Sequence, residues 1–320
     1  KCDELLDKRS QLDAQIQQLQ DRITHLKQAR IEKKHVIGWY LEFLNLLSCP
    51  VCHASMNLVH ASIENNAIKS GELTCQCSHR LHFEDGILVD PSSMKKNVEP
   101  DEAYFIRYIK QNSDRYLDNI YKAMEWGYRN IDVESVENKL VMELGVGNGI
   151  FLSHIIRALP ETARYIAVDY DLSRLKYLKK MLERVEYKAK VVFICADFKQ
   201  LPLKAQQVSY VVDFYGSTAF HMNETMFLHE YLQHLYTKNC GLMGIFMCFD
   251  RFKKTSKVPE GSQDFFKRES LAKRINALGF KPQIQTTIGD EEEQDKDDAF
   301  YEITNRIVNY GFSGCRREKR

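Results

Sequence analysis

Three glycines alternate with other residues directly behind a carboxylate in the stretch ELGVGNG, residues 143–149. The apolar residues around Glu143 are typical of a buried strand, and an apolar helical pattern begins after the last glycine. Glycine lets a chain turn tightly and lets a ligand contact the main chain. Gly145, Gly147 and Gly149 therefore predict a binding loop between a strand and a helix.

The spacing of this loop indicates which ligand it binds. A dinucleotide loop has the pattern G-x-G-x-x-G and places a pyrophosphate at a helix N-terminus. In this sequence the third glycine comes one residue too early, and Glu143 would repel a phosphate. A cationic ligand fits better. S-adenosylmethionine carries a sulfonium and an ammonium group, and it is the cofactor that we predict.

Acidic residues end the next three apolar runs of the chain. The run YIAVDYD reaches Asp169, whose carboxylate can accept both ribose hydroxyls, with Tyr170 beside it. The run VVFICADF ends at Asp197, which can accept from the adenine amino group, while Phe198 can cover the ring. The run VSYVVDFYG contains Asp213, which is either a site residue near the crevice or a strand-end turn residue.

Apolar runs alternate with helical patterns from Leu140 onward, which predicts a parallel sheet with crossover helices. The expected strands are 140–144, 164–168, 191–195, 208–214 and 241–249, and a tyrosine-rich helical region, 101 to about 129, precedes them.

The four strand ends resemble motifs I to IV of class I S-adenosylmethionine-dependent methyltransferases, over roughly residues 100–320. This resemblance implies an α/β, Rossmann-like fold with a mostly parallel seven-stranded sheet. It also implies methyl transfer by in-line displacement, in which orientation supplies much of the rate. The implied cofactor-binding residues are Glu143, Gly145, Gly147, Gly149, Asp169, Tyr170, Asp197, Phe198 and Asp213.

The catalytic residues are unknown from the sequence. Amino-group methyltransferases that act on bases often carry N/D-P-P-Y after the fourth strand, but Asp213 is followed here by Phe-Tyr-Gly without a proline. His221 and Glu224 form the acid–base pair that the sequence places nearest the site, and Asp213 is a third candidate. A helix start is the alternative reading of the stretch that holds His221 and Glu224.

A second group of chemically active residues lies earlier in the chain. Cys49 and Cys52 form a C-x2-C knuckle, and CQCSHRLH supplies Cys75, Cys77, His79 and His82 about two dozen residues later. Zinc takes four nitrogen or sulfur ligands at tetrahedral corners, and two such knuckles supply them. A closed set of four leaves no open position, so this zinc is expected to be structural.

This segment resembles the N-terminal zinc ribbon of the 23S rRNA guanine-N1 methyltransferases, which have C-P-x-C, then C-x3-H, then D-G. The resemblance implies Cys49, Cys52, Cys75 and His79 as the ligands, with Cys77 as the alternative to His79. It also makes ribosomal RNA a candidate acceptor.

Leucine and isoleucine recur in heptads near the start of the sequence, at positions 5, 12, 16, 19, 23 and 26. This pattern predicts either a coiled coil that forms a homodimer or an amphipathic helix lying on its own domain. The segment resembles the dimerisation helix of MerR-type transcription regulators. Because the sequence opens on Lys1, that resemblance makes an upstream DNA-binding domain an expectation.

We therefore expect three parts: a coiled-coil helix with its connector (1–45), a zinc ribbon (46–97) and a methyltransferase domain (98–320). The net charge of +1 argues against a strongly basic nucleic-acid-binding surface and leaves a small molecule as the second candidate acceptor. Clustered cysteines and the lack of a long apolar run favour a reducing, cytoplasmic location without a membrane span. The alternative functions are a regulator whose methyltransferase-like domain senses a ligand, and a zinc-dependent interaction module.

Overall fold

The computed structural model describes residues 12, 15–22, 37–95, 100, 102–131, 136–296, 298 and 300–316. The chain divides into two units, Lys1–Val36 and Ile37–Arg320. In the first unit, residues 12 and 15–22 are helical, as the heptad pattern predicts. The heptad positions Leu5, Ile23 and Leu26 lie outside the described residues.

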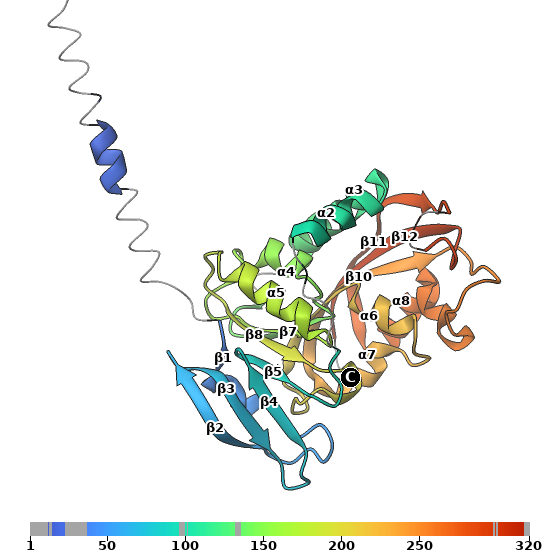
Figure 1. The fold of residues 1–320 in the computed structure, drawn as a ribbon. Coiled ribbons are helices and arrows are strands. Elements are labelled where there is room, and N and C mark those ends of the chain that lie inside the picture. Colours follow the sequence, from blue (N-terminus) through green and yellow to red (C-terminus); the bar gives the residue numbers. More distant parts are fainter. Residues whose placement is uncertain are drawn as a thin grey trace, which may run out of the picture. The chain divides into compact units, whose positions relative to one another are not determined.

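A mostly parallel sheet forms the centre of the second unit (Figure 1). Its seven core strands lie in the order β8-β7-β6-β9-β10-β12-β11, in which the first five pair in parallel and β12 pairs antiparallel with both β10 and β11. The predicted α/β fold is therefore confirmed. The strands are β6 (Leu140–Leu144), β7 (Arg164–Asp169), β8 (Lys190–Cys195), β9 (Val208–Phe214), β10 (Tyr236–Phe249), β11 (Phe280–Glu293) and β12 (Arg306–Arg316).

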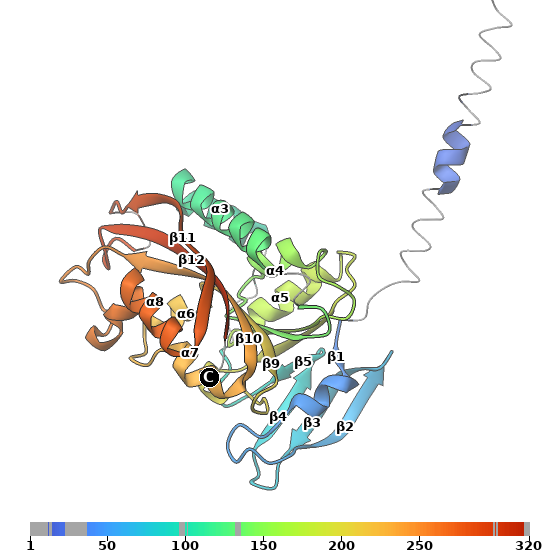
Figure 2. The ribbon, with the colours of Figure 1, turned by 180° about the vertical axis from the view of Figure 1, so that it is seen from behind.

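Helices cover both faces of this sheet, and the two views of the ribbon agree on their sides (Figure 2). One face carries α3, α4 and α5, and the other carries α7 and α8. The tyrosine-rich region forms two helices, because the chain breaks at Asn112 and the Ser113 hydroxyl then caps the second one by accepting from Tyr116 N at 3.1 Å. The helices are α2 (Glu102–Gln111), α3 (Asp114–Asn130), α4 (Ile150–Ile155), α5 (Leu172–Leu182), α6 (Gly216–His221), α7 (Leu228–Leu232) and α8 (Arg268–Ala277).

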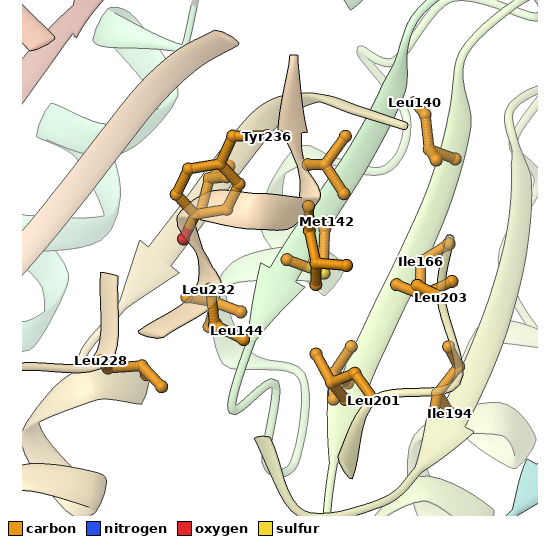
Figure 3. Packing of buried hydrophobic residues seen from close by; sticks show 14 of the residues in the cluster. Leu140, Met142, Leu144, Ile166, Ile194, Leu201, Leu203, Leu228, Leu232 and Tyr236 are labelled. Atoms are coloured by element: carbon orange, nitrogen blue, oxygen red, sulfur yellow. The ribbon is translucent and has the colours of Figure 1, made fainter. Parts of the chain in front are cut away.

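Side-chain alternation along the strands fills both layers. In β6, Leu140, Met142 and Leu144 enter one apolar cluster, while Val141 enters the cluster on the opposite face. Figure 3 shows the first cluster, where these three side chains lie near residues of the neighbouring strands and of α7. A strand buried on both faces reads as a continuous apolar run, which is why the sequence located these strands well.

The cysteine-bearing segment continues the same sheet. Strands β1 (Trp39–Tyr40), β2 (Asn57–Glu64), β3 (Ala67–Thr74), β4 (Arg80–Glu84) and β5 (Ile87–Val89) pair antiparallel with one another. Strand β5 then pairs parallel with β8, with Val89 opposite Cys195. One hydrogen-bonded sheet of twelve strands therefore runs from the cysteine segment to β11.

Four short 3-10 helices occur in the described part of the second unit, one of which is η4 (Gln233–Leu235). The others are η1 (Leu41–Leu46), η3 (Phe198–Gln200) and η5 (Glu260–Phe266). No described helix is long and apolar enough to cross a membrane.

Candidate cofactor site and cysteine cluster

A cavity of about 300 Å3 opens at the carboxyl ends of β6, β7 and β8. Carboxyl ends of parallel strands meet at one edge of a sheet, so residues far apart in sequence come together there. Five of the predicted cofactor-binding residues line this cavity: Gly145, Asp169, Tyr170, Asp197 and Phe198. Residues of α6 and the turn before it form the opposite wall.

The glycine loop brings two main-chain segments into contact. Gly145 has φ +63°, and a Cβ there would lie 2.8 Å from the Cα of Gly216 at the start of α6. A Cβ on Gly216 would lie 1.8 Å from the Leu144 carbonyl oxygen. The loop and α6 can therefore frame one cavity only because side chains are absent at both positions.

Asp169 is held by main-chain donors and still faces the cavity. Its Oδ2 accepts from Gly147 N at 2.8 Å, and its Oδ1 accepts from Asp171 N at 2.9 Å. Burial raises the pKa of Asp169, while these two N–H groups oppose that shift. Each carboxylate oxygen has a second lone pair, so the group retains capacity to accept from a ribose.

Asp197 begins the 3-10 helix η3 and presents its neighbour Phe198 to the cavity. Its Oδ1 accepts from Lys199 N at 2.8 Å, which fixes the carboxylate at the end of β8. Phe198 makes an edge-on contact with Phe220 of α6, with ring centroids 6.0 Å apart. The cavity thus has an acid and an aromatic face at the position predicted for adenine.

Glu143 lies behind the loop and is absent from the cavity lining. The side chain is buried, Tyr165 donates its hydroxyl to Oε2 at 2.8 Å, and burial raises the pKa of Glu143 to about 8. The carboxyl is therefore mainly protonated at neutral pH. The structure therefore places Glu143 behind the cavity wall, and its predicted role toward the ligand stays a prediction.

Asp213 is likewise buried, on the other face of the sheet. Its Oδ2 lies 2.8 Å from Nε2 of His229, and its Oδ1 accepts from Ser217 N at 3.0 Å. The other ring nitrogen of His229 lies 3.0 Å from the hydroxyl of Tyr236. Asp213 therefore anchors the start of α6 in place of lining the cavity.

His221 and Glu224 do not form an acid–base pair. His221 is buried against Phe227 and Phe265, its Nε2 accepts from Leu228 N at 3.0 Å, and burial lowers its pKa to about 3. Glu224 does line the cavity, where its carboxylate lies 2.6 Å from Nζ of Lys199. The predicted catalytic role of His221 is thus inconsistent with its surroundings, which are those of a core histidine.

Gly149 packs against α5 and is not among the residues that line the cavity. Its φ is +73°, and a Cβ there would lie 2.1 Å from Cδ1 of Leu178 in α5. A side chain at this position would collide with α5, so the close packing of the start of α4 against α5 requires a glycine.

Tyr215 is a site residue that the sequence reasoning missed. It lies in the turn between β9 and α6 with φ +60°, a left-handed conformation that is strained for an aromatic residue, and it lines the cavity. Its hydroxyl is buried and faces the amide of Asn309 without regular hydrogen-bond geometry. Tyr215 directly follows Asp213 and Phe214, where the fourth of the predicted motifs ends, and this position could have identified it from the sequence. Arg174, Ala219, Phe220 and Asn223 also line the cavity.

The comparisons with known proteins agree with this geometry. Residues 141–238, from β6 to the start of β10, match a family model described as a methyltransferase domain. This chain carries a methyltransferase domain over these residues. The domain model spans the glycine loop, Asp169, Asp197 and α6, but it does not include the cysteine segment or β11 and β12.

Solved methyltransferase structures are similar in fold to this one. An S-adenosylmethionine-dependent methyltransferase from Aquifex aeolicus is 14% identical, covers 58% of this chain and 90% of its own, and gives a TM-score of 0.42. Geranyl diphosphate C-methyltransferase from Streptomyces coelicolor is 9% identical, covers 60% of this chain and 74% of its own, and gives 0.44. At such low identity neither assigns an acceptor to this chain. A search of curated protein sequences finds no significant match.

The cysteine segment gathers four thiols in two turns. The Sγ atoms of Cys49, Cys52, Cys75 and Cys77 all lie within 4.8 Å of one another. The nearest pairs are Cys52 with Cys75 at 3.3 Å and Cys49 with Cys77 at 3.5 Å. The structure therefore favours Cys77 over His79 as the fourth member of the set.

His79 is not a member of the thiol set, and its imidazole lies beside a buried acid. Its Nε2 lies 3.5 Å from Oδ2 of Asp90, whose side chain is fully buried. His82, in β4, lies 3.5 Å from Glu84 and is also outside the set.

Proposed function

We propose that this methyltransferase domain transfers the methyl group of S-adenosylmethionine to a small-molecule acceptor. The observation that supports cofactor binding most is the single cavity of about 300 Å3 that Gly145, Asp169, Asp197 and Phe198 line together. The residues fit a nucleoside, because carboxylates stand where ribose and adenine donors are expected and the aromatic ring of Phe198 lines the same cavity. A bound S-adenosylmethionine supplies a methyl carbon that its positive sulfur makes electrophilic.

The contribution of the protein is then mainly orientation. Asp169 holds the ribose, Asp197 and Phe198 hold the adenine, and the main chain at Gly145 allows close approach. Glu224 is the one further carboxylate in the described lining of the cavity, and its ion pair with Lys199 orients it. We assign to Glu224 the acceptance of a proton from the acceptor.

The charges around the cavity favour a small molecule over RNA. An RNA backbone is bound through cations that can neutralise phosphates. Among the residues that line the cavity, Arg174 lies 3.5 Å from the carboxylate of Asp171. Lys199, which borders the site, is held by Glu224. Acidic groups at Asp169, Asp197 and Glu224 outnumber these partnered cations, so a phosphate chain would be repelled.

Calorimetry followed by transfer assays tests this proposal. S-adenosylmethionine and S-adenosylhomocysteine should each bind with one site per chain, and an absence of heat at millimolar ligand would overturn cofactor binding. Methyl-tritiated cofactor should then label a low-mass fraction of a metabolite extract and leave ribosomal RNA unlabelled. Label in the RNA would support methyltransferase activity but show that the acceptor is RNA and not a small molecule. Tight binding without any transfer would favour the ligand-sensing alternative.

We also propose that Cys49, Cys52, Cys75 and Cys77 bind one structural zinc ion. Zinc–sulfur bonds of about 2.3 Å at tetrahedral corners place sulfur atoms about 3.8 Å apart, which is close to the distances between these thiols. Cys52→Ser should reduce the bound zinc, measured by elemental analysis, from one per chain to near zero. Cys315→Ser, which changes a thiol in β12, is the matched control. An unchanged zinc content in Cys52→Ser would refute this ligand set.

The N-terminal helix is proposed to form a homodimer. Leu12, Ile16 and Leu19 are each more than half exposed, which leaves an apolar stripe at heptad spacing. Ile16→Glu with Leu19→Glu should halve the mass measured by light scattering, while Gln18→Glu on the same helix should not. A wild-type chain that is already monomeric would refute the dimer.

A further inference from the structure

The segment after β5 lies across the carboxyl ends of two core strands, although its polar sequence reads as a linker. We call residues 90–95 the strap. At its start, Asp90 N donates to the carbonyl of Cys195 in β8 at 2.9 Å. At its end, Lys95 N donates to the carbonyl of Tyr170 at 2.6 Å, and Leu172 N donates back to Lys95. The strap is therefore bonded to main chain beside both of the acids assigned to the cofactor.

One strap side chain contacts the adenine acid directly. Asp197 N donates to the hydroxyl oxygen of Ser93 at 3.1 Å. The turn that holds Ser93 is closed by Asp90, whose carbonyl accepts from Ser93 N at 3.2 Å and whose Oδ1 accepts from the Ser92 hydroxyl at 2.6 Å. The strap therefore holds the peptide of Asp197, while Lys199 N holds its carboxylate.

A histidine beside the cysteine cluster approaches the same buried acid from the second cysteine turn. Cys75 N donates to the carbonyl of His79 at 3.0 Å, so His79 closes the second cysteine turn. From that turn its imidazole reaches Oδ2 of Asp90 at 3.5 Å, with the histidine side chain 15% exposed. Asp90 is thus shared between the cysteine turn and the turn of the strap.

We propose that Ser93 is a positioning residue for adenine, and that His79 and Asp90 connect the cysteine cluster to it. On this view an ordered cysteine cluster improves cofactor selectivity through His79, Asp90, Ser93 and Asp197 in turn. The inference rests on the proposed function, because it needs Asp197 to accept from the adenine amino group.

A comparison of two cofactor products tests the role of Ser93. S-adenosylhomocysteine carries the adenine amino group, and S-inosylhomocysteine has an oxygen in its place. Wild-type protein should prefer the adenosyl compound in calorimetry. Ser93→Ala should weaken the binding of the adenosyl compound by roughly fivefold, the range of one hydrogen bond, and leave the affinity for the inosyl compound nearly unchanged.

Ser93→Thr keeps the hydroxyl and should restore the preference, and Ser62→Ala on the exposed strand β2 is the control. Equal weakening of both compounds would indicate a merely structural role and overturn the inference. Unchanged affinity for both would overturn it as well. A wild-type protein that binds neither compound would overturn the proposed function itself, so the two failures are distinguishable.

A second set of variants tests the connection to the cysteine cluster. His79→Ala should reduce the adenosyl preference in the same direction as Ser93→Ala, while His82→Ala on the same hairpin should not. The double variant His79→Ala/Ser93→Ala should lose no more preference than Ser93→Ala alone, because both act through one path. Fully additive losses, or a His82→Ala effect equal to that of His79→Ala, would refute the path.

Discussion

Four acids stand at the ends of four adjacent parallel strands, and they fall into two pairs with different surroundings. Asp169 and Asp197 line the cavity, whereas Glu143 and Asp213 are buried behind it. Glu143 belongs to the face that holds Tyr165, and Asp213 to the opposite face, with His229 and Tyr236. The lesson is that an acid within a strand points into a layer, while an acid at the strand tip can face a ligand.

The comparison is tested most strongly at Asp213. Asp213→Ala leaves the buried His229 without its partner and frees the start of α6, so the free energy of unfolding should fall by about 3–5 kcal/mol. Urea denaturation measures the loss. Asp264→Ala, which removes an exposed acid paired with Lys267, is the control and should leave stability nearly unchanged. A small effect at Asp213 would mean that this acid is not structural.

Asp169 should show the opposite behaviour. Asp169→Ala removes a charged acceptor from the cavity, so binding of S-adenosylhomocysteine should weaken by about 1–3 kcal/mol. Calorimetry on the folded variant gives the value, and the same Asp264→Ala protein serves as control. Unchanged affinity would show that the ribose lies elsewhere and would remove the distinction between the two pairs of acids.

Glu143 gives the smallest effect, and it depends on pH. Burial raises its folded-state pKa from 4.5 to about 8. Its contribution to stability is full below pH 4.5, where both states are protonated, and is lost as the pH rises through about 8. Between pH 6 and 7 the folded state holds a proton that the unfolded state has released. The free energy of unfolding therefore falls by about 1 kcal/mol over this interval.

Glu143→Gln removes this titration, so its unfolding free energy should fall less than that of wild type between pH 6 and 7. Urea denaturation at the two pH values measures the difference. Parallel losses in the two proteins would show that Glu143 is already ionised in the folded state, as the sequence argument assumed.

The sequence predicted the fold more completely than the site. Apolar runs buried on both faces located β6 to β9 closely, and the strand tips gave Asp169 and Asp197. Alternation alone did not say which acids face inward, because that depends on neighbours such as Tyr165 and His229 from other elements. Ser93 and Tyr215 were missed for a related reason: each acquires its role through long-range contact or an unusual backbone angle, which local patterns do not encode.

The pairing of β5 with β8 has a consequence for how the chain becomes ordered. Val89 finds its partner only after Cys195 has been synthesised, so the cysteine segment cannot pair its last strand until three of the seven core strands, β6, β7 and β8, exist. Before that moment β5 offers bare N–H and C=O groups to any neighbour, and a chain cut between the two segments would leave such an edge on both pieces.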